Sequence, residues 1–364
     1  MPSSISTTSE RCYLIAEAGV NHNGDPELAL ALIDAAASAG ADAVKFQTFR
    51  SEALSSRHAA KARYQVETTG ADDGQLAMLR RLELDAPTHL RLQKHAALRG
   101  IDFLSTPFDL ASAELLLTEL ALPRLKIGSG DLDNGPLLWR VATAGVPLIL
   151  STGMATLGEI EAALGVIACA YLGAQPGRAA FARAYADPAA QPLLRERVTL
   201  LHCTTEYPAP FDQLELRAMA TLTAAFGLPV GYSDHSEGTA VAPAAVALGA
   251  VVLEKHLTLD RTLPGPDHRA SLEPAQFAAM VQAVREVEAA LGAGRKCPGP
   301  AEWPNRAVAR KSLVAAQAIT AGELFTPANL TTKRPGHGRS PLDYWDVLGS
   351  GAARDYGEDE VIDP

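Results

Sequence analysis

The chain has 364 residues, of which 47% are hydrophobic, and its formal net charge is −10. This composition is typical of a soluble globular protein, long enough for one large domain with a sizeable core plus a small one. No window reaches the roughly 18 consecutive apolar residues of a membrane span, and no Lys/Arg-rich block points to nucleic acid or a membrane surface, so we expect a cytoplasmic protein that binds neither.

Eight short apolar or β-branched runs recur along the chain, separated by Ala/Leu-rich stretches with helical periodicity. The expected strands are 12–19, 41–49, 100–108, 124–131, 147–153, 198–208, 229–235 and 250–259. The clearest expected helices are 26–40, 110–122, 157–173, 237–250 and 273–292. Because eight βα units close a barrel, the pattern favours an α/β fold with a TIM barrel over a doubly wound sheet.

Two segments interrupt the alternation, residues 50–84 and residues 173–197. Both are too long for simple connections. Long insertions after a barrel strand are often substrate-covering loops, and a peripheral excursion is the equally weighted alternative.

The end of the barrel is marked by a change in composition. Residues 1–291 form the expected barrel domain, and residues 292–312 are rich in Gly, Pro and charge, which predicts a linker. Residues 313–364 form a small C-terminal domain. Because some fifty residues bury little core alone, we expect this domain to dock on the barrel or on a partner subunit.

Polar residues gather at the carboxyl ends of the expected strands, where barrel enzymes carry their chemistry. They are Glu17, Lys45, Gln47, Thr106, Lys126, Ser129, Thr152, Thr205, Tyr207, Ser233, His235, Glu254 and His256. The period of two in a strand places Ser233 with His235, and Glu254 with His256, on common faces. Lys255 points the opposite way, and we expect it to form a structural ion pair.

Two pairs of these residues suggest specific chemistry. His235 and His256, on neighbouring strands with Glu254 nearby, form a plausible site for Mn²⁺ or a similar divalent ion, and a buried hydrogen-bond network without metal is the alternative. Lys45 and Lys126 could clamp an anion, provide a Schiff-base nucleophile or form ion pairs within the barrel. Because burying two lysines is costly unless anions meet them, we favour a phosphate or carboxylate ligand.

Ordered motifs along almost the whole chain resemble the sialic acid synthase family, the bacterial N-acetylneuraminate synthase group. They include IAEAGVNHNGD, AVKFQTF, STPFD, LKIGSGD, LSTGMA, LLHCTTEYPAP, GYSDHS, EKHLTLD and GPDHRASLEP. The segment TPANLTTKRPGHG resembles the antifreeze-like (SAF) domain that these enzymes carry after their barrel. The resemblance implies condensation of phosphoenolpyruvate with an N-acylated mannose-type sugar, which yields a nine-carbon 2-keto-3-deoxy sugar acid and phosphate.

The resemblance also assigns roles to individual residues. It implies that His235 and His256 bind a divalent metal, Mn²⁺ or else Mg²⁺ or Co²⁺, and that Glu17 lies by the reacting centre. Residues implied to hold phosphoenolpyruvate are Lys45, Gln47, Thr106, Lys126, Ser129, Thr152 and Ser233. Residues implied to face the sugar are Asp131, Thr205, Tyr207 and Arg334. Glu17 or Glu254 would move protons. The family further implies a homodimer in which the C-terminal domain of one chain caps the barrel of the other.

Several alternatives remain open at this point. The segments CTTEYPAP and GPDHRASLEP are more similar to those of the neuraminate and legionaminate branches than to those of the pseudaminate branch, whose acceptor is an altrose-type sugar. Between the first two we prefer N-acetylmannosamine as acceptor, giving N-acetylneuraminate, and the alternative is a 2,4-diacetamido-2,4,6-trideoxymannose, giving N,N'-diacetyllegionaminate. Asp131 and Thr205 stand where some family members have Glu and Asn. A Schiff-base aldolase using Lys126 or Lys45, a metal-dependent aldolase with another donor and a non-enzymatic carbohydrate- or ice-binding protein are rival functions.

Overall fold

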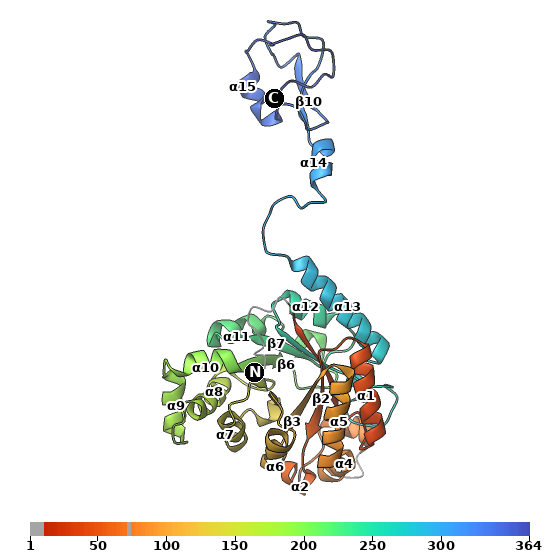
Figure 1. Ribbon diagram of the computed structural model, residues 1–364, viewed down its shortest axis with the longest axis vertical. Helices are drawn as coiled ribbons and strands as arrows, with labels where there is room; N and C mark the ends of the chain where they lie inside the picture. The colour runs from red at the N-terminus through yellow and green to blue at the C-terminus, as the bar shows by residue number, and fades with distance from the viewer. Residues whose placement is uncertain (1–10, 71–73) are drawn as a thin grey trace. The chain divides into compact units, whose positions relative to one another are not determined.

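In the computed structural model, which describes residues 11–70 and 74–364, the described residues form eight parallel strands at the centre of the larger part of the molecule (Figure 1). The strands are β1 (Tyr13–Gly19), β2 (Ala43–Thr48), β3 (Asp102–Pro107), β4 (Leu125–Ile127), β5 (Leu148–Ser151), β6 (Val198–Cys203), β7 (Val230–Asp234) and β8 (Val252–His256). Each lies within one of the predicted ranges.

The order of the strands closes the sheet. The hydrogen-bonded sequence is β3-β2-β1-β8-β7-β6-β5-β4, so the first strand pairs with the last, and β3 and β4 at its two ends lie in contact. The predicted TIM barrel is therefore confirmed. All pairings in this sheet are parallel, which brings the carboxyl ends of the strands together at one mouth.

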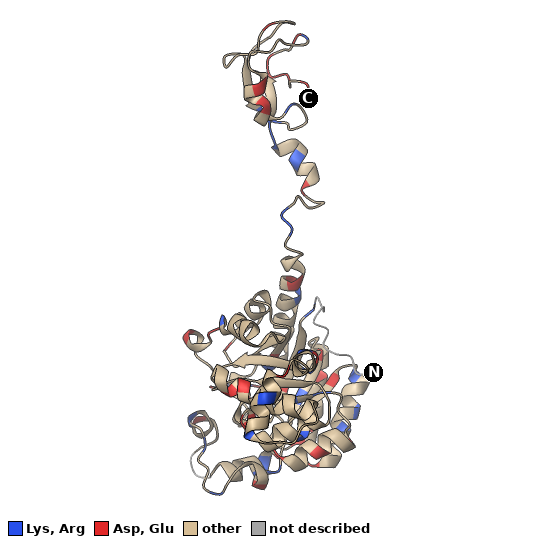
Figure 2. Ribbon diagram, turned by 90° about the vertical axis from the view of Figure 1, so that its left-hand side faces the viewer, with Lys and Arg blue, Asp and Glu red and all other residues tan. Residues whose placement is uncertain are grey.

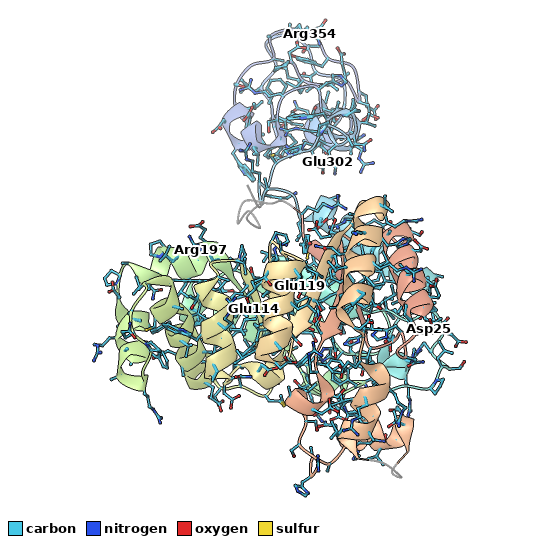
Figure 3. All side chains as sticks on the ribbon, turned by 60° about the horizontal axis from the view of Figure 1, so that its bottom comes forward. Asp25, Glu114, Glu119, Arg197, Glu302 and Arg354 are labelled. Atoms are coloured by element: carbon cyan, nitrogen blue, oxygen red, sulfur yellow. The ribbon has the colours of Figure 1, made fainter. Side chains whose placement is uncertain are left out.

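Helices surround the barrel and bury their apolar faces against the strands (Figure 1). They are α1 (Pro26–Ser38), α5 (Ala86–Arg99), α6 (Leu110–Glu114) with the π-helical turn η1 (Leu115–Glu119), α7 (Gly135–Thr143), α8 (Leu157–Tyr171), α11 (Ala218–Phe226), α12 (Val241–Ala247) and α13 (Pro274–Leu291). Short 3-10 turns are η2 (Ser129–Asp131), η3 (Phe211–Gln213) and η4 (His268–Ala270). Acidic and basic residues are interspersed over the outer helices (Figure 2). Exposed Glu114 and Glu119, for example, lie on the outside of the barrel (Figure 3).

The inside of the barrel is divided into layers by the alternation of the strands. A layer of buried apolar side chains fills its lower part: Ile15, Ala43, Leu104, Ile149, Leu201 and Val252. We call this layer the apolar plug. Two residues further along the same strands, the inward positions become polar: Glu17, Lys45, Thr106, Ser151, Cys203 and Glu254. The period of two thus places a polar layer directly above an apolar seal.

The two insertions have different places in the fold. Residues 50–84 include α2 (Ser51–Leu54), α3 (Arg63–Thr69) and α4 (Gln75–Leu82), and α4 anchors itself through Met78 and Leu82 to Val20 and Phe49. Residues 173–197 include α9 (Arg178–Ala186) and α10 (Ala190–Arg197), which pack against α8. The second insertion is a peripheral excursion, whereas the first reaches the mouth of the barrel.

A second compact unit runs from Ala293 to Pro364. It contains α14 (Trp303–Ala309), an antiparallel pair of β9 (Ser312–Ala315) with β10 (Leu330–Lys333), η5 (Pro341–Asp343) and α15 (Tyr344–Val347). Its own small core consists of Leu313, Ala315, Ile319, Phe325, Leu330, Val347, Ala352, Tyr356 and Ile362. The predicted linker thus includes one short helix. Across both units, the described helices include none with the length and apolar character needed to cross a membrane.

Candidate active site

Four charged side chains form a buried cluster in the polar layer above the apolar plug. Lys45 Nζ lies 2.7 Å from Glu17 Oε2 and 3.6 Å from Glu254 Oε2. Lys126 Nζ lies 3.1 Å from Glu254 Oε1. All four side chains are at most 4% exposed. Two lysines and two glutamates therefore share one water-poor space, and we call them the charge cluster.

Neutral side chains hold the charge cluster in place. Lys45 Nζ donates to Thr106 Oγ1 at 3.1 Å, and Gln47 Nε2 donates to Glu17 Oε1 at 3.3 Å. Ser233 Oγ donates to Glu254 Oε1 at 2.8 Å. Each of these contacts joins side chains from different strands, so the barrel itself fixes the arrangement.

The protonation of the cluster follows from burial and from the charges within it. Burial by itself would raise the pKa of Glu254, but Lys126 and Lys45 outweigh it and lower that pKa, so this carboxylate is ionised. Burial raises the pKa of Glu17 despite the opposing effect of Lys45. Burial also lowers the pKa of Lys126. The cluster thus contains a firmly ionised carboxylate beside one that takes up a proton more readily.

His235 and His256 lie side by side above the cluster, with ring centroids 5.6 Å apart. His235 Nδ1 is 2.7 Å from the carbonyl oxygen of Thr204, which makes that nitrogen the N–H donor and leaves the lone pair on Nε2. His235 Nε2 lies 3.3 Å from Tyr207 Oη and 3.2 Å from Ser233 Oγ. The structure therefore brings the two predicted histidines together.

Both imidazoles are neutral. Burial lowers the pKa of His235 to about 4, and burial together with His235 lowers the pKa of His256 well below its usual value. His256 Nδ1 has no hydrogen-bond partner among the described residues, and it lies 3.9 Å from Asp267 Oδ2. Neutral imidazoles with available lone pairs are the form in which histidine binds a metal.

A cavity of about 350 Å³ opens above the charge cluster and the histidines. Twelve of the predicted site residues line it: Glu17, Lys45, Gln47, Thr106, Lys126, Ser129, Thr205, Tyr207, Ser233, His235, Glu254 and His256. The insertion 50–84 supplies a further part of the wall through Leu54, Tyr64, Gln65, Gln75, Met78, Leu79 and Leu82. Of the two readings of this insertion, the structure supports the covering one.

Gly153 packs closely behind two residues of the cavity wall, Thr205 and Ser129. A Cβ atom at this position would stand 2.3 Å from Thr205 Oγ1 and 2.9 Å from Ser129 Oγ, so only glycine fits. The backbone N–H of Gly153 donates to Ser129 Oγ at 3.0 Å. Thr205 Oγ1 is buried without a hydrogen-bond partner among the described residues, which leaves it available to a ligand.

Two predicted residues of the barrel, Thr152 and Asp131, are not among those that line the cavity. Thr152 Oγ1 donates to the carbonyl oxygen of Leu201 at 2.9 Å, and Thr152 lines a neighbouring pocket of about 1070 Å³ that shares Tyr64, Thr205 and Tyr207 with the cavity. Asp131 accepts a hydrogen bond from Asn134 Nδ2 at 2.8 Å. Arg334 belongs to the C-terminal unit, and its predicted role at the sugar stays a prediction.

Asp267 is a cavity residue that the reasoning from sequence missed. It follows β8 in the loop GPDH, it is 7% exposed, and burial followed by repulsion from Glu17 raises its pKa to about 7. The motif GPDHRASLEP contained the signal, because loops after barrel strands approach the mouth. Strand periodicity could not single it out, since it has no place in a strand.

Comparison with known proteins identifies the family. The NeuB family model matches residues 32–296, and the SAF domain model matches residues 310–364. The chain belongs to the NeuB family. The antifreeze-like C-terminal module expected from TPANLTTKRPGHG is confirmed as an SAF domain by the second match.

Relatives within the family match nearly the full length. The chain is 49% identical over 353 residues to the N,N'-diacetyllegionaminic acid synthase of Campylobacter jejuni, with 97% of this chain and 99% of the relative covered. It is 41% identical to the enzyme of the same name from Legionella pneumophila, with 94% and 91% covered. A crystal structure of N-acetylneuraminic acid synthetase from Leptospira borgpetersenii, in complex with citrate, matches with a TM-score of 0.65 and 32% identity, covering 84% and 95%.

These matches confirm the predicted enzyme class. The chain is a NeuB-type synthase that forms a sugar acid of the nonulosonic type, and the rival hypothesis of a non-enzymatic binding protein is set aside. Membership of the family does not by itself identify the acceptor sugar.

Proposed function

We propose that this enzyme condenses phosphoenolpyruvate with 2,4-diacetamido-2,4,6-trideoxymannose and water to give N,N'-diacetyllegionaminate and phosphate. The observation that carries the reaction class is the charge cluster beneath a pair of neutral histidines in one cavity. The acceptor rests on the names of the two relatives at 49% and 41% identity. The comparisons thus favour the alternative acceptor over N-acetylmannosamine, the acceptor that we preferred from the sequence.

The donor fits the lower part of the cavity. Phosphoenolpyruvate carries a phosphate and a carboxylate, and Lys45 and Lys126 are the cations buried at the cavity floor. Thr106, Ser129 and Ser233 add hydroxyl groups to the lining of the same cavity. A multiply charged anion meeting these donors would replace part of the lysine–glutamate pairing, so the lysines act as an anion clamp.

A divalent metal fits beside the donor. Among the described residues no group of three or more His, Cys, Asp or Glu side chains is arranged as a complete metal site. His235 and His256 nevertheless present neutral imidazoles, and His256 Nδ1 has no hydrogen-bond partner within residues 11–70 and 74–364, which suits a catalytic site that leaves positions open to substrate and water. When bound there, a metal such as Mn²⁺ would supply Lewis-acid polarisation of the sugar aldehyde.

The proposed reaction consists of one C–C bond formation, the addition of water and the loss of phosphate. Carbon 3 of phosphoenolpyruvate attacks the aldehyde carbon of the open-chain sugar, and the aldehyde oxygen takes up a proton. Water adds to carbon 2 and loses a proton, and the tetrahedral intermediate expels phosphate by cleavage of the C–O bond. Of the two candidate carboxylates, Glu17 and Glu254, we assign the transfer of a proton between these atoms to Glu17, because burial raises its pKa.

The arrangement argues against a Schiff-base aldolase. Lys45 Nζ contacts the carboxylates of Glu17 and Glu254, which raise its pKa despite burial, and Lys126 Nζ is ion-paired with Glu254 Oε1, so both amines are engaged with carboxylates. A Schiff-base lysine must instead present a free amine to a carbonyl. Borohydride trapping with pyruvate would reveal such a lysine.

The test is a phosphate-release assay with three acceptors in parallel. We expect the highest kcat/KM with 2,4-diacetamido-2,4,6-trideoxymannose, compared with N-acetylmannosamine and the altrose-type precursor of pseudaminate. Consumption of phosphoenolpyruvate must match phosphate release one to one. Faster turnover of N-acetylmannosamine would overturn the proposed acceptor, and consumption of pyruvate in place of phosphoenolpyruvate would overturn the reaction class.

A further inference from the structure

Part of the wall of the cavity is apolar. Val20, Phe49, Met78 and Leu82 form a buried satellite cluster, and Leu54, Leu79 and Phe108 pack on it while remaining partly exposed. Leu54, Leu79 and Phe108 also line the cavity. We call these three residues the apolar wall. Their exposed surface faces the space that a ligand would fill.

The apolar wall differs from the floor in origin as well as chemistry. The floor consists of barrel strand ends, whereas Leu54 and Leu79 come from α2 and α4 of the insertion 50–84, and Phe108 directly follows β3. The same insertion also brings the amides of Gln65 and Gln75 to the cavity. The apolar part of the cavity wall thus comes largely from a different segment of the chain than the charge cluster.

The reaction dictates which end of the sugar meets this wall. The aldehyde carbon C1 must lie at the floor, next to the donor above Lys45 and Lys126. The remaining carbons of the open chain lead away from the floor toward the insertion 50–84, and C6 is the carbon farthest along the chain from C1. A C6 methyl group would cover apolar surface, whereas a C6 hydroxyl would lose its hydration there.

We propose that the apolar wall selects acceptors that lack the 6-hydroxyl group, with Leu54 and Leu79 as specificity-determining residues. This inference rests on the proposed function and deepens it. An apolar pocket discriminates between a methyl and a hydroxymethyl group by about 10- to 100-fold, because the added hydroxyl is only partly rejected. The wall therefore sets a preference rather than an absolute requirement.

The experiment compares two sugars that differ only at C6, N-acetylmannosamine and its 6-deoxy analogue, 2-acetamido-2,6-dideoxymannose. For the wild-type enzyme we expect kcat/KM to favour the 6-deoxy sugar by about 10-fold or more. Leu79→Gln places an amide at the wall, and the ratio should fall toward one. Leu79→Met is the matched control, because it keeps an apolar side chain of similar volume and should keep the ratio.

A second polar variant keeps the inference testable if the first variant fails to fold. Leu54→Thr changes the same wall from a different helix and should lower the ratio in the same direction, with the KM for phosphoenolpyruvate unchanged in each variant. An equal C6 ratio in wild type and both polar variants would overturn the inference alone. Absence of phosphate release by the wild type with every mannose-type sugar would instead overturn the proposed function.

Discussion

The two faces of strand β8 carry buried ionisable groups that differ in how completely they are hydrogen-bonded. On the outward face, Lys255 is completely buried and donates to Asp234 Oδ2 at 2.9 Å and to the carbonyl oxygen of Ser236 at 2.5 Å. Asp234 Oδ1 in turn accepts from the backbone N–H and the hydroxyl group of Ser236. The predicted structural ion pair of Lys255 is confirmed, and its bonding is satisfied within the protein.

On the inward face, bonding capacity is left over. Glu254 is shared between Lys126, Lys45 and Ser233, and His256 Nδ1 lacks a hydrogen-bond partner among the described residues. Both faces are buried, since the exposed fractions are 3% for Glu254, 5% for His256 and 0% for Lys255. The comparison teaches that burial of charge does not by itself mark a functional site; the informative feature is a buried polar group whose partners are incomplete.

The largest expected effect is on the inward face, through metal removal. Treatment with EDTA should abolish phosphate release, and Mn²⁺, Co²⁺ or Mg²⁺ should restore it, because the neutral histidines have lone pairs to offer. His256→Ala should remove Mn²⁺ binding measured by calorimetry while the circular dichroism spectrum stays native. Full turnover of His256→Ala or His235→Ala in the presence of chelator would contradict the metal site.

The outward face should respond through stability. Lys255→Met leaves the carboxylate of Asp234 buried without its cation, which should lower the free energy of unfolding by about 3–5 kcal/mol in urea titrations. The matched control is the double variant Lys255→Met/Asp234→Leu, which removes both charges and should recover most of the loss. A loss below about 1 kcal/mol for the single variant would mean that the outward pair is unimportant.

The variant Lys126→Met tests the inward face again, and its expected effect on kcat/KM is intermediate in size. Loss of a cation facing a multiply charged donor should cost about 2 kcal/mol or more, a fall of roughly 30-fold in kcat/KM for phosphoenolpyruvate. Lys126→Arg is the control, since it keeps the charge and changes its geometry. A damaged kcat/KM for the sugar with an unchanged donor profile would assign Lys126 to the acceptor.

His22 extends the comparison to a buried histidine on which burial outweighs the opposing effect of the Asp25 carboxylate. Burial, followed by repulsion from His89 and His268, lowers the pKa of His22 to about 3. The unfolded chain binds a proton below about pH 6.5 while the folded protein does not, so the free energy of unfolding should fall as the pH falls from about 6.5 toward 3, by up to about 1.4 kcal/mol per pH unit.

The variant His22→Asn tests this assignment. The backbone N–H of Gly24 donates to His22 Nδ1 at 3.0 Å, and an asparagine oxygen can accept the same bond. Urea titrations at pH 7, 6 and 5 should give a flatter pH dependence for the variant than for the wild type. An identical slope in both proteins would show that other groups cause the acid sensitivity.

The strands and the floor of the site could be predicted from the sequence because they follow a period of two. Glu254 and His256 stand on one face and Lys255 on the other, and alternation alone gives that result. Loop residues obey no such period. Asp267 and Tyr64 reach the cavity through the paths of their segments, which depend on packing that is not local in the sequence.

Two further features show where the sequence signal ends. Residues 292–312 are rich in Gly and Pro, and this composition predicts a linker. It hides the seven-residue helix α14 within the segment, whose start is marked in the sequence only by a Trp-Pro pair. The motifs around the barrel mouth identify the family but not the acceptor, because the motifs encode the shared floor. The apolar wall comes mostly from the insertion 50–84, which no quoted motif covers.

The apolar plug has a consequence for the order of events in the catalytic cycle. The apolar plug, which includes Ile15, Leu104 and Val252, closes the barrel below the charge cluster. Substrates and products therefore enter and leave the cavity through the mouth of the barrel. A donor held at the floor must enter before the acceptor covers it. Phosphate, released at the same depth, must wait for the sugar acid above it to depart. Steady-state kinetics should therefore be sequential and ordered, with phosphate competitive against phosphoenolpyruvate.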